Sequence, residues 1–392
     1  MPAPYCRKTL LVVSGTVTAA VKSALGDGKG LEFYDFSEDY FKAFFGDILV
    51  EVDDESLFDE FDAKTVAKVT DTPKFIINDL TLRDDVAVKA FTSTLESVFP
   101  TSAYADGYTK NLGISFTKKK ICEVNVSRPR VFIPVFPGTN CEYDTAKRFR
   151  KAGAKVETFV VRNRDERDIE KSVEEIAKII RNSQIIAFPG GFSGGDEPDG
   201  SGKFIATTFR NPVIVDALYD MMDKRDGLII GICNGFQALI KLGLLPFGKI
   251  APPTSASPTL TFNNISRHVS TIARIRVASN LSPWFNAVKT GDVFSVPVSH
   301  GEGRFVAPKN VMEQLIVKGQ IATQYVDMNN NATMETPFNP NGSEYAVEGI
   351  TSADGRILGK MGHSERIGQN LYRNYPGDFD MKIFESGVKY FK

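Results

Sequence analysis

The chain has 392 residues, of which 42% are hydrophobic and 24% are charged, and its formal net charge is −1. This length allows two or three domains with separate cores, and no apolar run reaches the roughly 20 residues that a membrane-spanning helix needs. A near-neutral charge also lacks the concentrated basic face of nucleic-acid-binding proteins. The composition therefore indicates a soluble globular protein with neither a membrane nor a nucleic-acid partner.

Residues 1–126 carry a different charge from the rest of the chain. They hold 14 lysines and arginines against 20 acidic residues, whereas the remainder holds 33 against 28. Strand-forming residues cluster at 46–52, 65–71 and 74–79, and a helical pattern follows at about 83–98. The polar, glycine-containing stretch 101–120 is typical of a linker. We therefore expect a smaller N-terminal α+β unit over 1–126 and a second domain over 127–392.

From residue 128 onward, apolar runs alternate with amphipathic helical patterns. Strands are expected at 130–136, 155–161, 184–191 and 227–233. Helices are expected at 139–153, 168–183 and 211–226, and from residue 234. This alternation indicates an α/β fold, in which a mostly parallel sheet carries helices on both faces. In such sheets the active site lies beyond the carboxyl ends of the strands, and Cys233 stands at one of them.

The cysteine at this strand end lies between two glycines, in the sequence Gly-Ile-Cys-Asn-Gly at 231–235. A nucleophile on a sharp strand-to-helix turn needs small neighbours, and the start of the following helix favours the thiolate. We therefore predict that Cys233 is a nucleophile, whereas Cys141 lacks such neighbours and is expected to pack. The spacing of the four cysteines matches neither a zinc site nor a disulfide framework, which indicates a reducing cytoplasm and no metal site.

Two histidines are followed by a glutamate two residues later, His363 by Glu365 and His300 by Glu302. Residues two apart in an extended chain share a face, so the carboxylate can orient the ring of a catalytic base. The spacing alone fits both pairs. Because glycines flank Glu302 on both sides, the second pair suits a substrate-contacting loop, and His363 is the predicted base.

The stretch Ala-Phe-Pro-Gly-Gly-Phe-Ser-Gly-Gly-Asp at 187–196 follows an expected strand. Its glycines, including Gly190 and Gly191, let backbone N–H groups turn towards a ligand. With the N–H of Asn234, this loop is predicted to form an oxyanion hole. Two Gly-Lys stretches, at 26–30 and 199–204, do not match a Walker loop, so no nucleotide cofactor is expected in this chain.

Four motifs, in the order PGGFSGGD, GICNGFQ, SHGEGRF and GHSER, resemble those of class I glutamine amidotransferases. VFPGTNCEYDTA, TFNNISRH and the tail NLYRNYPGDFDMKIFESGVKYF are similar to the glutaminase domains of phosphoribosylformylglycinamidine synthases. The resemblance covers roughly residues 128–392. It implies a flavodoxin-like glutaminase fold and the hydrolysis of glutamine.

The resemblance also implies a role for each matching residue. Cys233 would attack the glutamine side-chain amide, His363 oriented by Glu365 would move protons, and water would hydrolyse the thioester. The other residues that it places at the site are Phe192 and Asn234, as backbone oxyanion donors, and Gln237, His300 and Glu302, beside the glutamine. Many members carry proline after the catalytic histidine, where this chain has Ser364; the His-x-Glu pair is intact.

The same family passes its ammonia to a synthetase part, where ATP and Mg²⁺ serve to activate formylglycinamide ribonucleotide. The resemblance therefore implies a synthetase domain or subunit as the partner of this chain. The stretches 33–55 and 93–101 are similar to the trailing portion of that synthetase domain. Residues 1–126 are accordingly expected to be a truncated synthetase-like unit.

The residues leave two other functions open. The same nucleophile turn serves cysteine hydrolases that cleave peptides or γ-glutamyl compounds without transferring ammonia. Alternatively, the chain is an assembly module whose glutaminase is silent until a synthetase docks. The products released from glutamine, and the effect of a synthetase partner on the rate, distinguish these functions.

Overall fold

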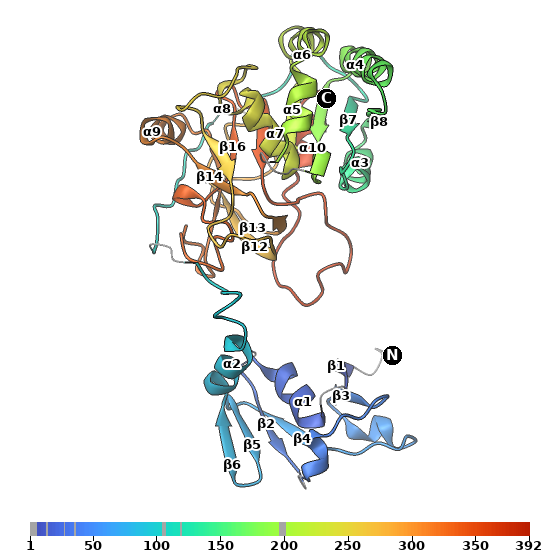
Figure 1. Cartoon of the computed structure of the whole chain (residues 1–392), viewed down its shortest axis with the longest axis vertical. Coiled ribbons are helices and arrows are strands. Elements are labelled where there is room, and N and C mark those ends of the chain that lie inside the picture. Colours follow the sequence, from blue (N-terminus) through green and yellow to red (C-terminus); the bar gives the residue numbers. More distant parts are fainter. Residues whose placement is uncertain are drawn as a thin grey trace. The chain divides into compact units, whose positions relative to one another are not determined.

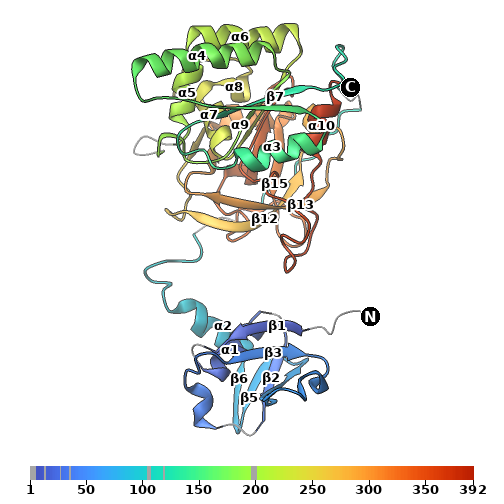
Figure 2. The same cartoon turned by 90° about the vertical axis from the view of Figure 1, so that its right-hand side faces the viewer.

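The computed structural model describes residues 6–12, 15–26, 28–34, 37–103, 107–117, 120–195 and 201–392. It divides into two compact units, Met1–Thr101 and Ser102–Lys392, each with its own hydrophobic core (Figures 1 and 2). Within the described part, every helix is too short or too polar to cross a bilayer. The two units are described separately below.

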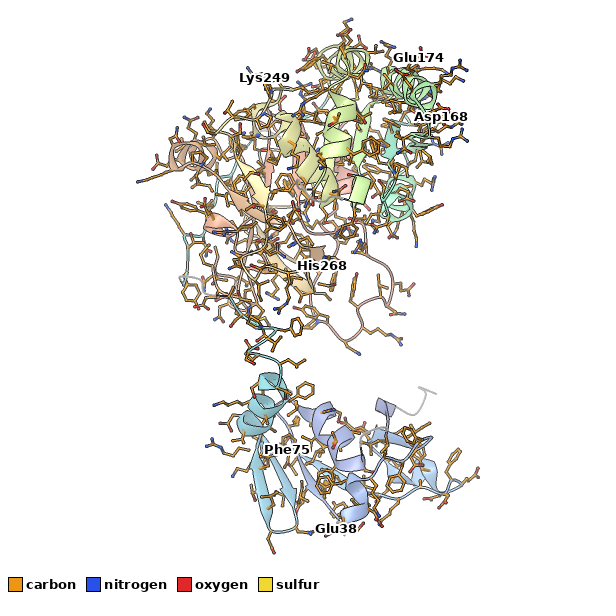
Figure 3. The ribbon with its side chains drawn as sticks, viewed as in Figure 1. Glu38, Phe75, Asp168, Glu174, Lys249 and His268 are labelled. Carbon is orange, nitrogen blue, oxygen red and sulfur yellow. The ribbon has the colours of Figure 1, made fainter. Side chains whose placement is uncertain are left out.

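The first unit is a small α+β unit. Its strands are β1 (Cys6–Leu11), β2 (Gly30–Phe33), β3 (Ile48–Val52), β4 (Ala67–Thr70), β5 (Lys74–Ile77) and β6 (Leu80–Arg83), and its helices are α1 (Thr16–Ala24) and α2 (Asp84–Ser93). Four strands form a sheet in the order β4-β2-β5-β6, and β1 pairs with β3. Phe75 on β5 is fully buried among apolar residues of β2 and α1 (Figure 3). The strands and helices of this acidic unit thus pack around one small hydrophobic core.

Residues 102–126 belong to the second compact unit, although the sequence led us to place them with the first unit and to regard most of them as a linker. Leu112 donates its N–H to Gln324 Oε1 at 2.8 Å, and the N–H of Cys122 reaches the carbonyl of Tyr390 at 3.0 Å. Part of the expected linker, residues 104–106 and 118–119, lies outside the described residues. The described remainder forms hydrogen bonds with residues that are far away in the sequence. Composition alone could not indicate these bonds.

The second unit is built on a nine-stranded sheet with the order β13-β12-β15-β16-β17-β10-β9-β7-β8. Its strands are β7 (Arg130–Val135), β8 (Lys155–Val160), β9 (Ile185–Phe188), β10 (Leu228–Ile232), β12 (Val269–Val277), β13 (Val293–His300), β15 (Ile321–Tyr325), β16 (Val347–Thr351) and β17 (Ile357–Lys360). A separate pair joins β11 (Thr259–Thr261) to β14 (Arg304–Val306). Every residue of β9, β10 and β17 is buried, as expected for strands covered on both faces.

Helices cover both faces of this sheet. They are α3 (Glu142–Lys151), α4 (Glu166–Arg181), α5 (Lys203–Phe209), α6 (Pro212–Lys224), α7 (Asn234–Leu242), α8 (Leu244–Phe247), α9 (Lys309–Val317) and α10 (Ile383–Lys389). Figure 2 shows α4 and α6 side by side on one face of the sheet near β7, and α3 and α10 on the other. Polar caps begin two of these helices, because Asp165 accepts from the N–H of Asp168 and Asn211 from that of Val213. The predicted α/β fold with both faces covered is confirmed.

The sheet is less parallel than predicted. Strands β8, β7, β9, β10 and β17 are parallel to one another, but β16, β15, β12 and β13 continue the sheet in antiparallel pairs. Between β16 and β17 the reason is the length of the connection: the chain returns through residues 352–356, too few for a crossover helix. This antiparallel half carries His300 and borders the loop that carries His363.

Candidate active site

Cys233 occupies a strained turn between β10 and α7. Its φ of 52° and ψ of −107° lie outside the regions that a non-glycine residue normally adopts. Gly231 and Gly235 make the turn possible: a Cβ at Gly235 would lie 2.1 Å from the carbonyl oxygen of Phe188, and one at Gly231 would lie 2.7 Å from the oxygen of Gly235. The backbone contacts therefore demand glycine on both sides of the cysteine, as in a nucleophile elbow.

This close approach gives a first prediction. Gly235→Ala should lower the free energy of unfolding by about 1–3 kcal/mol, because the added methyl group overpacks α7 against the end of β9. It should also reduce glutamine hydrolysis, because the turn that aims Cys233 must shift. Gly113→Ala is the matched control, since its Cβ would meet only ordinary contacts at 3.8 and 3.9 Å. Chemical denaturation measures the change in stability, and initial rates measure the change in hydrolysis. Equal stability of Gly235→Ala and Gly113→Ala would contradict the prediction.

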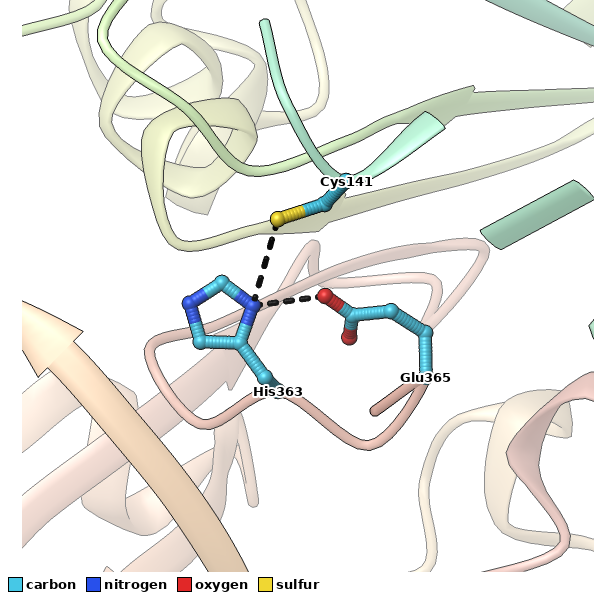
Figure 4. A group of neighbouring side chains, drawn as sticks. All are labelled: Cys141, His363 and Glu365. Atoms are coloured by element: carbon cyan, nitrogen blue, oxygen red, sulfur yellow. Dashed lines mark hydrogen bonds and ion pairs between the residues drawn. The ribbon is translucent and has the colours of Figure 1, made fainter. Parts of the chain in front are cut away.

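His363 and Glu365 form a buried hydrogen-bonded pair in the loop after β17. The ring Nδ1 lies 2.6 Å from Glu365 Oε1, and the two side chains are 1% and 0% exposed (Figure 4). Burial acts to raise the pKa of Glu365, but the charge and hydrogen bond of His363 outweigh it and lower that pKa below its usual value. An ionised Glu365 accepts a hydrogen bond from Nδ1–H, so the neutral ring carries its lone pair on Nε2. Nε2 has no hydrogen-bond partner among the described residues.

His300 and Glu302 lie near the site but do not pair with each other. His300 Nδ1 contacts Asn263 Oδ1 at 3.2 Å, whereas Glu302 Oε2 accepts from the N–H of Ser201 at 3.0 Å. The spacing of two residues therefore gives a histidine–carboxylate pair only at His363. Burial, and then the charge of His363, lowers the pKa of His300 to about 3, so that His300 is neutral near pH 7.

The depressed pKa of His300 gives a second prediction. Below about pH 6.5 the unfolded chain binds a proton at this residue and the folded chain does not, so stability is complete above that pH and is lost as the pH falls towards about 3. Between pH 6 and pH 4 the free energy of unfolding of His300→Gln should therefore vary less steeply than that of the parent chain. The difference should be about 1.4 kcal/mol per pH unit. Denaturation curves at several pH values give the free energy of unfolding of each protein. If this free energy changes equally with pH in both proteins, the prediction is wrong.

The thiol of Cys233 is protonated at rest. Its Sγ is directed at the carbonyl of Ser299 at 3.7 Å. Burial, and then the nearby Cys141 and Glu365, raises its pKa to about 12, against the opposing effects of Arg366 and the N–H of Asn234. The N–H of Asn234 at the start of α7 lowers this pKa in the expected direction, but burial raises it by more. A base must therefore take the proton when the thiol reacts.

The two expected oxyanion donors differ in their present use. The N–H of Asn234 interacts with the Cys233 sulfur, which places it at the reacting centre. The N–H of Phe192 instead donates to the carbonyl of Gly138 at 2.8 Å, so this hydrogen bond would have to open before the N–H could serve as the second donor. Of the stretch 187–196, Asp196 lies outside the described residues, as do Asp199 and Gly200 of 199–204 and Asp27 of 26–30.

The remaining predicted pocket residues form one chain of hydrogen bonds. Asn234 Nδ2 donates to Gln237 Oε1 at 3.0 Å, and Gln237 Nε2 donates to the carbonyl of Glu302 at 2.5 Å. Gly190 lies beneath the base, where a Cβ would come within 2.7 Å of His363 Cε1, and Gly191 packs on the backbone of Gly138. The structure thus brings all of the predicted site residues of the second unit to one end of the sheet.

Cys141 and Arg366 are residues at this site whose involvement the sequence did not predict. Cys141 precedes α3 and was expected only to pack, yet its Sγ lies 3.8 Å from His363 Nδ1 (Figure 4). The same sulfur accepts from Arg366 Nη2 at 2.9 Å. Because that ring nitrogen is already bonded to Glu365, it cannot serve as the base for Cys141. The only sequence signals were a thiol near a helix start and a cation beside the His-x-Glu pair.

Cys141, His363 and Glu365 also bring three potential metal-ligating atoms within 4.8 Å of one another. The 2.6 Å separation of the ring nitrogen and the carboxylate is that of a hydrogen bond, and the guanidinium of Arg366 beside the sulfur opposes a cation. The arrangement fits proton transfer better than metal binding.

Comparison with known proteins places this site in a family. The model of the CobB/CobQ-like glutamine amidotransferase domain matches residues 128–391. A phosphoribosylformylglycinamidine synthase subunit PurQ from Methanococcus maripaludis is 35% identical over 257 residues, 65% of this chain and 87% of that protein. The subunit of the same name from Aquifex aeolicus is 33% identical over 245 residues, 62% of this chain and 93% of that protein. A solved structure of PurLQS from Thermotoga maritima aligns with a TM-score of 0.49 and 26% identity, over 68% of this chain and 100% of that one. Over residues 128–391, the chain belongs to the CobB/CobQ-like glutamine amidotransferase domain family.

Proposed function

We propose that the second unit hydrolyses L-glutamine to glutamate and ammonia through a thioester on Cys233. The observation that carries the proposal is the buried His363–Glu365 pair, whose ring Nε2 has no partner in the described part of the chain. It stands at the same end of the sheet as a cysteine in an elbow, in a member of the glutamine amidotransferase family.

The proposed reaction uses these groups in two halves. His363 Nε2 takes the proton of the Cys233 thiol, whose pKa of about 12 requires a base, and the sulfur attacks the side-chain carbonyl carbon of glutamine. The carbon–nitrogen bond then breaks and His363 returns the proton to the leaving nitrogen, which departs as ammonia. Water, deprotonated by the same nitrogen, hydrolyses the thioester to glutamate, and the thiol regains its proton. Glu365 holds the ring tautomer and stabilises the imidazolium.

The oxyanion formed in each half needs two donors. The Asn234 N–H is one candidate. For the Phe192 N–H to be the other, its hydrogen bond to Gly138 must first break. We propose that glutamine binding or a synthetase partner drives this exchange.

We further propose that the ammonia is delivered to a synthetase domain or subunit, for the ATP-dependent formation of formylglycinamidine ribonucleotide in purine biosynthesis. The PurQ relatives, which are subunits of phosphoribosylformylglycinamidine synthase by name, support this destination. Residues 1–126 would then be the synthetase-like unit that their sequence suggested, with the stretch from residue 102 packed on the glutaminase.

The decisive experiment offers the purified chain L-glutamine, a γ-glutamyl anilide and a peptide, each with and without an added synthetase subunit. We expect glutamate and ammonia in equal amounts from glutamine, at a rate that the synthetase raises. Cleavage of the anilide or peptide without any turnover of glutamine would assign the chain to the other hydrolases. If glutamine is turned over but the synthetase never converts the released ammonia to the amidine, the purine-pathway part of the proposal fails alone.

A further inference from the structure

A fully buried ion pair lies between the two strands that lead to the candidate site. Lys360 Nζ of β17 lies 3.0 Å from Glu348 Oε1 of β16, and both side chains are 0% exposed. The strands are antiparallel neighbours, with Gly349 opposite Lys360. Removing two charges from water is costly, and an apolar pair of the same size often serves stability as well or better. The question is therefore what else this pair holds in place.

Both charged groups bind the backbone of Gly362, the residue immediately before His363. Lys360 Nζ donates to the Gly362 carbonyl at 2.7 Å, and Glu348 Oε1 accepts from the Gly362 N–H at 2.6 Å. The second oxygen of Glu348 accepts from the hydroxyl of Thr323 on β15. A Cβ at Gly362 would lie 2.9 Å from Glu348 Oε1, so the glycine lets the backbone come this close. The ion pair thus fixes the peptide groups from which the base extends.

The main chain of Lys360 also fixes the nucleophile. Its carbonyl accepts from the N–H of Cys233 at 2.9 Å, where β10 and β17 pair in parallel with Ile232 opposite Lys360. A single residue therefore contacts the peptide of Cys233 through its backbone and the peptide before His363 through its ammonium group. The N–H of His363 is anchored separately, on the carbonyl of Pro297 at 2.8 Å.

We propose that Glu348 and Lys360 are positioning residues, which set the separation and orientation of Cys233 relative to His363 Nε2. This inference rests on the proposed glutaminase function and adds two residues to it. Proton transfer from sulfur to nitrogen requires hydrogen-bond distance, and displacements of about 1 Å cost on the order of 10²-fold in rate. A pair that merely stabilised the sheet would be replaceable by apolar side chains without loss of turnover.

The test compares two substitutions of the pair. The double variant Glu348→Leu with Lys360→Met removes both charges and keeps the volume, but it leaves both backbone groups of Gly362 without partners. We expect it to fold, with kcat for glutamine lowered roughly 10- to 100-fold and KM within about threefold of the parent value. Glu348→Gln is the milder variant, because its amide oxygen still accepts from Gly362, and it should lose only several-fold in kcat.

A second readout needs no turnover. The rate at which iodoacetamide alkylates Cys233 is measured by mass spectrometry at several pH values. The component of this rate that depends on His363 is the part that is lost in His363→Ala. We expect both pair variants to weaken this component. Arg148→Met is the matched control, since the ion pair between the buried Arg148 and the partly exposed Asp380, 3.0 Å apart, joins α3 to the segment before α10. It should lower the melting temperature and leave kcat and the alkylation profile unchanged.

The outcomes distinguish a positioning role of the ion pair from a purely structural one. If the folded double variant and Glu348→Gln both turn over glutamine within twofold of the parent chain, with unchanged alkylation profiles, the positioning role is wrong. The positioning role is also wrong if activity falls only in proportion to the fraction of folded protein that melting curves report. If the parent chain shows no Cys233-dependent turnover of glutamine, the proposed function fails, while the alkylation profiles still decide whether the pair positions His363 against Cys233.

Discussion

Replacing Cys233 with alanine is expected to lower glutamate release from glutamine by on the order of 10³-fold or more, because it removes the sulfur on which the thioester is proposed to form. The substitution keeps the Cβ at the strained φ of 52° and removes only the sulfur, so it is not expected to unfold the domain. Glutamate release under saturating glutamine, with the synthetase partner present, measures the effect.

Two other cysteines serve as controls for this variant. Cys122→Ala should retain the parent rate, since Cys122 is a packed residue whose N–H pairs with Tyr390. Cys141→Ala removes a sulfur 3.8 Å from His363 Nδ1 and should lower the rate without abolishing it. An inactive Cys141→Ala beside an active Cys233→Ala would mean that the nucleophile is Cys141.

Replacing His363 with alanine should lower kcat by about 10²- to 10⁴-fold, since the one ring is proposed both to deprotonate a thiol of pKa about 12 and to protonate the leaving nitrogen. The effect should fall on kcat more than on KM, because His363 is buried and is proposed to act on transferred protons. Steady-state kinetics with glutamine check it.

His300→Ala is the natural counterpart of this variant. Its ring is buried near the candidate site, with Nδ1 on Asn263 and Nε2 without a partner among the described residues, so its loss should mainly raise KM. A collapse of kcat in His300→Ala, together with a near-normal kcat in His363→Ala, would reverse the assignment of the base.

Much of the parallel half of the fold can be predicted from the sequence because its signals are local. The apolar run at 227–233 and the two glycines around Cys233 identify a buried strand and a tight turn without any knowledge of their neighbours. The structure has β10 at Leu228–Ile232 and α7 from Asn234, with both glycines in contacts that exclude a Cβ. Helix boundaries agree to within a few residues for α4 and α6, where Asp165 and Asn211 cap the first turn.

What could not be predicted depends on contacts between distant segments. Cys141 reaches the ring of His363 across 222 residues of sequence, and the Phe192 N–H finds the carbonyl of Gly138 rather than a ligand. Glu348 and Lys360 stand as single charges in apolar strands, where only the sheet order reveals them as partners. The antiparallel pair of β16 and β17 likewise follows from a short connection whose pairing no local pattern specifies.

The most direct test of the central claim, that Cys233 attacks glutamine, is covalent labelling with a glutamine analogue that carries an electrophilic carbon, such as 6-diazo-5-oxo-L-norleucine. The labelled chain is digested and the modified peptide is identified by mass spectrometry, with excess glutamine as the competitor. We expect one adduct per chain, on Cys233, which glutamine suppresses and which forms far more slowly in His363→Ala. An adduct on Cys141, or labelling of Cys233 that glutamine does not suppress, would contradict it.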